Sequence, residues 1–251
     1  MLMLSHAIEV PRASLRGIPT PAPTDSWRPV PHADAVDALT ERAAARGLKI
    51  CSERYAVMPG HLYPVPGTMV EIPGGRLFGS LDFEPLAGAP FPEGCRPSAG
   101  IRNSHDKSFS LSVLCGARVL VCANGVLSAE FIVARKHTSG IDLSVAIDEA
   151  LSAFMESIKN FQRTYERLRS WRLSVPKAHH LAVELARAGA FASSDILPVV
   201  NEFENPRHAE FKERTAWTMY NAATEIAKRQ SPARQVEGFK ALNSVLLPAL
   251  N

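Results

Sequence analysis

Seven large apolar residues between Ile147 and Leu168 follow one another at strictly alternating spacings of four and three. Side chains at these spacings lie along one face of an α-helix, and neither proline nor glycine interrupts the segment. The repeat therefore predicts a single amphipathic helix of about 30 residues with a heptad-like apolar seam. The apolar face of such a helix must be covered, either by the rest of the chain or by a second copy.

Between Leu48 and His137 the alternation of polar and apolar residues predicts strands. The predicted strands are 49–57, 76–83, 109–114, 118–122 and 127–134. The last three form an antiparallel meander, with turns at Cys115-Gly116-Ala117 and Asn124-Gly125, and residues 85–97 form a loop. A meander leaves one apolar face open, which we expect part of the long helix to cover.

A short helix over 34–46 precedes the strands and ends at Gly47. Beyond Pro176 the pattern predicts shorter helices at 177–188, 194–203, 207–229 and 233–247. The fold class is therefore α+β: an antiparallel β-meander preceded by a short helix and followed by a long helix and a C-terminal helical layer. We divide the chain into an arm (1–33), an α+β domain (34–173) and a C-terminal helical subdomain packed on it (174–251).

Six prolines punctuate the first 33 residues and predict an extended arm without regular structure. Trp27 lies within this arm and requires a surface on which to dock. The sequence leaves open whether that surface belongs to the same chain or to a neighbouring subunit, so a homo-oligomer is one expected state.

Composition restricts the class of protein. Apolar residues make up 46% of the chain and charged residues 21%, which is typical of a globular protein and excludes wholesale disorder. No apolar stretch approaches the roughly 20 residues of a membrane-spanning helix, so we expect no membrane partner. The four cysteines form no CxxC pair, which favours a reduced, cytoplasmic protein. A net charge of +3 permits an anionic partner without requiring one.

The densest polar cluster is the segment RNSHDK at 102–107, immediately before the meander, and the segment RKH at 135–137 closes the same meander. An antiparallel path can return both segments to one rim of the sheet. His105, Asp106 and His137 are then candidate ligands of a divalent metal, although their spacing matches no closed metal motif. The alternative is a polar strand end whose side chains bond backbone amides in a turn.

A third interpretation of the same cluster is recognition of an anion. Basic residues outnumber acidic ones in this stretch, and guanidinium and ammonium groups on a sheet rim suit a phosphate backbone. The candidate nucleic-acid or anion-binding residues are Arg102, Asn103, His105, Lys107, Arg118, Arg135, Lys136 and His137. Phe109 or Phe131 adds base stacking if either ring faces outward, although such phenylalanines more commonly belong to the core.

No catalytic residue can be assigned. The chain has no GxSxG, HExxH, P-loop or GxGxxG pattern, and Cys115 and Cys122 lie in apolar strand contexts where a thiol is inert. We expect no cofactor, with a divalent metal at the cluster above as the alternative. Near the C-terminus, Phe211, Trp217 and Tyr220 offer a base-stacking face, but packing of an amphipathic helix explains such residues without a ligand and is favoured.

Four segments resemble one known family. They are IPTPAPTDSWRPVPH near the start, GIRNSHDKSFSLSVLCGARVLVCANGVLSAE in the middle, RKHT, and NPRHAEFKERTAWTMYNAATEIAK late in the chain. Their collinear order is similar to that of phage/plasmid-like proteins with domain of unknown function 932. The resemblance implies a phage, prophage or plasmid setting in a bacterial host cell, and it assigns no activity. The family-like positions are Arg102, Asn103, Ser104, His105, Asp106, Cys122, Asn124, Arg135, Lys136, His137, Trp217 and Asn221.

A weaker resemblance lies in the order of elements. The order of a short helix, a curved meander and one long helix is similar to that of phage single-strand annealing proteins. Those proteins bind DNA in a basic groove between sheet and helix and form rings or filaments.

The leading hypothesis is a non-enzymatic protein of a mobile element that binds nucleic acid. Single-stranded DNA is the favoured partner, in recombination, replication or host-defence evasion. One alternative is a metal-dependent phosphodiester or nucleotide hydrolase using His105, Asp106 and His137. The other is a defence-modulating protein that binds a host protein. A basic groove would favour the first hypothesis, and a large apolar patch would favour the last.

Overall fold

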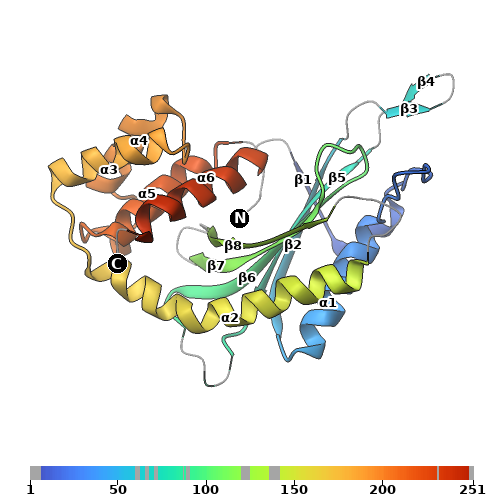
Figure 1. Ribbon diagram of the computed structural model, residues 1–251, viewed down its shortest axis with the longest axis horizontal. Coiled ribbons are helices and arrows are strands. Elements are labelled where there is room, and N and C mark those ends of the chain that lie inside the picture. Colours follow the sequence, from blue (N-terminus) through green and yellow to red (C-terminus); the bar gives the residue numbers. More distant parts are fainter. Residues whose placement is uncertain are drawn as a thin grey trace.

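The computed structural model describes residues 7–59, 63–65, 68–70, 73–86, 88, 91–119, 125–135, 142–230 and 232–248. Within them an antiparallel sheet is accompanied by helices that come before and after it in the chain, which confirms the α+β class. Figure 1 shows α2 (Leu143–Ser170) crossing one face of the sheet and the later helices gathered beside it.

The main sheet has six strands in the order β1-β2-β5-β6-β7-β8, and each neighbouring pair is antiparallel. The strands are β1 (Ile8–Val10), β2 (Ile50–Met58), β5 (Arg76–Phe83), β6 (Cys95–Ser104), β7 (Leu111–Val119) and β8 (Gly125–Arg135). A separate pair, β3 (Tyr63–Val65) and β4 (Thr68–Val70), projects from the body between β2 and β5 (Figure 1).

Two of the sequence predictions for the sheet are wrong. The chain does not turn at Cys115-Gly116-Ala117, because β7 runs through these residues as one strand, and only its pairing with β8 shifts register between Leu114 and Gly116. Gly116 therefore marks an irregularity in the ladder and not a turn. The structure also places β6 over part of the predicted loop 85–97 and part of the polar cluster. Pro97 within a central strand is the reason that the sequence pattern does not indicate it. Asn124 lies outside the described residues.

The helices agree with the sequence pattern except in one place. They are α1 (His32–Ala45), α2, α3 (Val175–Arg187), α4 (Ile196–Glu204), α5 (Ala216–Ala227) and α6 (Pro232–Leu246), with short 3-10 turns η1 (Arg12–Gly17), η2 (Ser193–Asp195) and η3 (Ala209–Phe211). The predicted helix 207–229 is shorter than expected, because Thr215 caps α5 by accepting a hydrogen bond from the Thr218 amide.

One face of the sheet, here called the apolar face, packs against α1 and the first half of α2. Leu77, Leu81, Ile101 and Val113 point to this side and share one buried cluster with Leu39 of α1. The first four seam residues of α2, Ile147, Leu151, Phe154 and Ile158, belong to the same cluster. The last three, Phe161, Tyr165 and Leu168, pack into the C-terminal helical layer. The whole seam is therefore covered within one chain.

The helical layer is built around α5, in which eleven of twelve residues are buried. Trp217 stacks on Tyr220, and both rings are almost completely buried. Phe211, Met219 and Ile226 lie in the same core. A helix buried on all sides is a core element, which favours packing over a base-stacking face for these residues.

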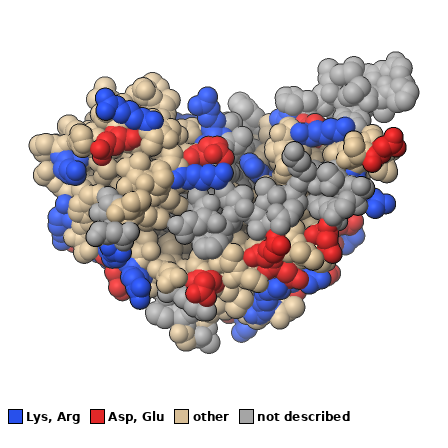
Figure 2. All heavy atoms as spheres, in the orientation of Figure 1, with Lys and Arg blue, Asp and Glu red and all other residues tan. Residues whose placement is uncertain are grey.

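Charged side chains of both signs are spread over the face of the molecule seen in Figure 2. In the described part of the chain, no helix combines the length and the apolar character that crossing a membrane requires.

Replacement of Gly79 tests the packing of the sheet. A Cβ atom at Gly79 would lie 2.8 Å from Cγ2 of Ile101 and 2.9 Å from the buried Tyr55 ring, so both neighbours would have to move. We expect Gly79→Ala to lower the free energy of unfolding by about 1–3 kcal/mol in urea titrations. Gly17→Ala is the matched control, since its Cβ would meet no atom within 4 Å, and it should change stability by less than about 0.5 kcal/mol. Equal stabilities for the two variants would contradict the packing described.

Candidate nucleic-acid interface

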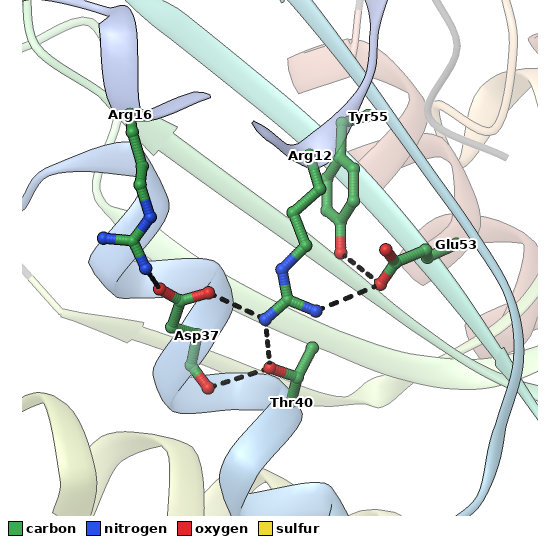
Figure 3. A network of polar contacts seen from close by, with 6 residues as sticks. All are labelled: Arg12, Arg16, Asp37, Thr40, Glu53 and Tyr55. Carbon is green, nitrogen blue, oxygen red and sulfur yellow. Dashed lines mark hydrogen bonds and ion pairs between the residues drawn. The ribbon is translucent and has the colours of Figure 1, made fainter. Parts of the chain in front are cut away.

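The N-terminal arm is folded onto its own chain. β1 pairs with β2 and forms the edge of the sheet, and η1 follows it, so the expectation that residues 1–33 lack regular structure is wrong for these two segments. Arg12 on η1 binds Asp37 of α1 at 2.7 Å and Glu53 of β2 at 3.4 Å, and the Tyr55 hydroxyl donates to the same Glu53 (Figure 3). Trp27 is 6% exposed and faces Lys107, so it docks within the chain.

A buried polar cluster fixes the end of the arm to the sheet. The Asn103 side chain on β6 donates to the Val30 carbonyl at 2.7 Å and to Nδ1 of His32 at 2.8 Å. His32 in turn donates through Nε2 to the Gly74 carbonyl at 3.0 Å. The His105 ring stacks on the His32 ring with centroids 3.8 Å apart, and all three side chains are at most 1% exposed. We call Asn103, His32 and His105 the histidine cluster.

The surroundings of His105 are those of a structural residue. Its Nε2 faces the Val30 carbonyl at 2.9 Å, and its Nδ1 faces the Pro19 carbonyl at 3.1 Å. Burial lowers the pKa of His105 below its usual 6.5, and this outweighs the opposing effects of the two carbonyls and Asp106. Both ring nitrogens are thus directed at the arm, and a metal ion could bind either one only by displacing a carbonyl.

Asp106 also has a structural partner. Its carboxylate, 1% exposed, binds Nε of Arg76 at 2.7 Å and accepts a hydrogen bond from the Ser108 amide at 3.0 Å. Lys107, the next residue, has a φ of 62°, which is uncommon for a residue with a side chain. Among the residues that the structure describes, no group of three or more His, Cys, Asp and Glu side chains is placed to hold a metal ion. His137, the third predicted ligand, lies outside them.

The structure brings together only part of the two polar segments, 102–107 and 135–137, that the sequence predicts to lie at one rim. Arg135 ends β8 opposite Leu111, so its backbone lies at the rim where β6 ends in Ser104 and His105 follows. Lys136 and His137 lie outside the described residues. Arg118 is at the other end of β7, opposite Gly125, and binds Asp82. The structure therefore separates Arg118 from the rim that carries Arg102.

The register of the strands brings five arginines to the face opposite the apolar face. Ser80 pairs with Arg54, Phe78 with Arg102, and Ser104 with Arg76, while Arg96 pairs with Arg118. Cross-strand partners point to the same side of a sheet, and residues two apart in one strand do too. The arginine face, as we call it, comprises Arg54, Arg76, Arg96, Arg102 and Arg118, all partly buried. Arg54, Arg76 and Arg96 cannot be recognised from the sequence, because cross-strand register has no signal in a single segment.

Three of these guanidinium groups are neutralised by carboxylates. Arg54 binds Glu9, Arg76 binds Asp106, and Arg118 binds Asp82, which also accepts from the Ser98 hydroxyl. Within the described residues neither Arg96 nor Arg102 has a carboxylate at ion-pair distance. Arg96 faces Arg118 directly across the ladder, an arrangement of like charges that destabilises a sheet.

Arg102 combines a cation with an aromatic ring. Its guanidinium carbon lies 5.3 Å from the centre of the Phe109 ring, and Phe109 in turn contacts Phe78 on the same face. Its Nε is buried without a hydrogen-bond partner in the described part of the chain. Burial lowers the pKa of Arg102, against a weaker opposing effect of Glu237, because the charged form has lost hydration. Phe109 is partly buried and packs against the core of the helical layer.

Comparison with known proteins gives one match. A family model described as Domain of unknown function (DUF932) matches residues 96–247, which is more than half of the chain. The chain belongs to this family. No curated protein and no solved structure shows a significant match. The matched span of the DUF932 chain begins in β6 and ends beyond α6, so it contains Asn103 and His105. Their partners Pro19, Val30 and His32 lie before it.

The histidine cluster makes the stability of the DUF932 chain depend on pH. His105 takes up a proton near pH 6.5 in the unfolded chain and only at lower pH in the folded one. The unfolded state therefore binds more protons below pH 6.5, and acidification favours unfolding by up to about 1.4 kcal/mol per pH unit. We expect the urea midpoint to fall between about pH 7.5 and about pH 5.5.

His105→Gln should be less stable than the parent at the higher pH and should lose less stability on acidification. His180→Gln, which replaces an exposed histidine of α3, is the control and should keep the pH dependence of the parent. An unchanged pH dependence in His105→Gln would show that His105 does not titrate as described.

Proposed function

We propose that this protein binds nucleic acid through the arginine face, with single-stranded DNA as the preferred partner, and that it acts without catalysis. The observation that carries the proposal is the pair Arg96 and Arg102. Both belong to β6, both point to the same face, and neither has a carboxylate at ion-pair distance in the described residues. A cation held at a partly buried position without a counter-ion is costly, and a phosphate group would offset that cost.

The spacing of the two arginines suits a nucleic-acid strand that contacts both ends of the face, since Phe78 and Leu114 on this face are buried against the helical layer. Arg96 and Arg102 are six residues apart on one strand, which corresponds to roughly 20 Å. Arg54, Arg76 and Arg118 lie on neighbouring strands, and a guanidinium bound to one carboxylate keeps further N–H donors for a phosphate. Phe109 beside Arg102 offers a ring on which an unpaired base can stack, which favours single strands over a duplex.

The remaining candidates of the sequence analysis belong to the same proposal. Lys107 and Arg135 lie at the rim near Arg102, and Lys136 and His137 follow Arg135 in the chain. Asn103 and His105 contribute to binding indirectly, because their buried hydrogen bonds hold the loop that carries Lys107 and Phe109. The setting that we propose is the bacterial cytoplasm and a phage, prophage or plasmid, in recombination, replication or host-defence evasion. It rests on the resemblance of the central segment.

Substitution of the two uncompensated arginines tests the proposal. We expect Arg96→Ala and Arg102→Ala each to weaken binding of single-stranded DNA about tenfold at low salt, whatever its sequence, because each removes a charge-assisted contact to phosphate. Each should also flatten the plot of log affinity against log salt by roughly 0.7 in fluorescence anisotropy titrations.

Arg16→Ala is the matched control, since Arg16 is 71% exposed and binds Asp37 of α1, which covers the apolar face. It should leave both the affinity and the salt dependence unchanged. No binding by the parent protein at low salt, or binding that does not depend on salt, would refute a phosphate-binding role.

A further inference from the structure

A second concentration of basic side chains lies where α2 ends and α3 begins. It comprises Arg163, Arg167, Arg169, Arg172, Lys177, Lys212 and Arg214, and we call it the α2–α3 surface. All except Arg167 are exposed. In Figure 2, Lys and Arg side chains follow the lower left edge of the molecule, where Figure 1 shows the end of α2 and the start of α3.

Contacts between the segments show that this surface is continuous. Arg169 and Arg172 both approach Glu213 at 3.7 Å. The Leu173 amide donates to the Arg214 carbonyl at 2.9 Å, which joins the end of α2 to the segment before α5. Lys177 lies in the first turn of α3, capped by Ser174 two residues after Arg172.

The charge of the α2–α3 surface exceeds that of the whole chain. Its seven basic residues share these segments with three carboxylates, Glu166, Glu210 and Glu213, so the surface has a net charge of +4. The complete chain has +3, and the rest of the molecule is therefore slightly acidic. Basic residues in the last turn of α2 stabilise that helix through its dipole. The same effect does not account for Lys177, which lies at the unfavourable end of α3, or for Lys212 and Arg214 outside any α-helix.

We infer that the α2–α3 surface is a second binding site for the phosphate backbone of a nucleic acid, separate from the arginine face. The inference rests on the proposed function and extends it. Arg163 is exposed in the second half of α2, whose apolar residues pack into the helical layer, whereas the arginine face belongs to the strands of the sheet, so the two surfaces lie on different parts of the fold. A strand must be long to reach both surfaces, whereas a short strand occupies one of them.

A nucleic acid fits this surface better than a protein partner does. Protein interfaces depend on apolar or aromatic anchors that become buried. Among the described residues the exposed large apolar side chains are Ile8, Val145 and Leu197, and none of them belongs to the α2–α3 surface. A surface of exposed arginine and lysine side chains without an apolar centre attracts phosphate groups through its charge.

Oligonucleotides of two lengths test the inference. The test variant replaces Arg163, Lys177 and Lys212 together by alanine, since all three are exposed. Single-stranded DNA of about 8 nucleotides should bind this variant as tightly as the parent, which also shows that the variant is folded. DNA of about 40 nucleotides should bind it more weakly than the parent, with the log–log salt dependence flattened by roughly 2 for three lost contacts.

The double variant Arg96→Ala with Arg102→Ala is the comparison and should weaken binding at both lengths. The inference is overturned if the triple variant binds the long strand like the parent while the double variant does not; the proposed function then stands. If the parent binds neither length, the proposed function fails as well. If poly-glutamate of matched charge displaced the 40-nucleotide strand as effectively as unlabelled DNA does, the inference would be overturned in favour of an acidic polypeptide.

Discussion

The carbonyl group of Val30 lies between two prolines, in a segment that has few backbone donors to offer it. It is buried and accepts hydrogen bonds from Asn103 and His105, which sit at the end of β6 and just beyond it. A buried carbonyl without donors would cost several kcal/mol, on the order of a lost hydrogen bond or more. These bonds fix where the arm ends. α1 begins at His32, whose ring is held by Asn103 and stacked on His105, and α1 then covers the apolar face of the sheet.

Two unlike faces of one sheet follow from this arrangement. The helices α1 and α2 take the apolar face, and the other face carries guanidinium groups in rows set by strand register. Phe78 and Leu114 on this second face are buried against the C-terminal helical layer. Three of the five arginines are locked by Glu9, Asp106 and Asp82, so they support the sheet as well as adding positive charge. Asp106 thereby links the two systems, because it binds Arg76 and directly follows His105. The polar segment 102–107 is thus first a structural junction, and any role in binding depends on the loop that it positions.

Prediction from sequence succeeded where one segment contains the whole signal. The four–three repeat of α2 and the Gly47 stop of α1 are of this kind, since helix formation and termination depend on neighbours a few residues away. It failed at β6, where Pro97 and Gly100 hide a strand whose ladders are supplied by β5 and β7. The supposed turn at Gly116 failed for the same reason, because continuous pairing with β6 carries β7 through it. Asn103 and His105 belong to the polar cluster that the sequence indicates, but their hydrogen-bond partners lie 71 to 86 residues away in the chain.

Local patterns in the amino-acid sequence are enough to predict the class of the fold, the length of α2 and the polar cluster before β7. The excess of basic residues on the last turns of α2 is likewise visible in the sequence, because side chains four residues apart lie on the same side of a helix. Three features become visible only in the folded chain: the arm folds back on its own chain, the His105 ring faces two backbone carbonyls, and five arginines from four strands share one face. These features depend on burial, hydrogen-bond partners and cross-strand register, which arise between segments distant in the chain, and no local spacing encodes which of those segments will meet.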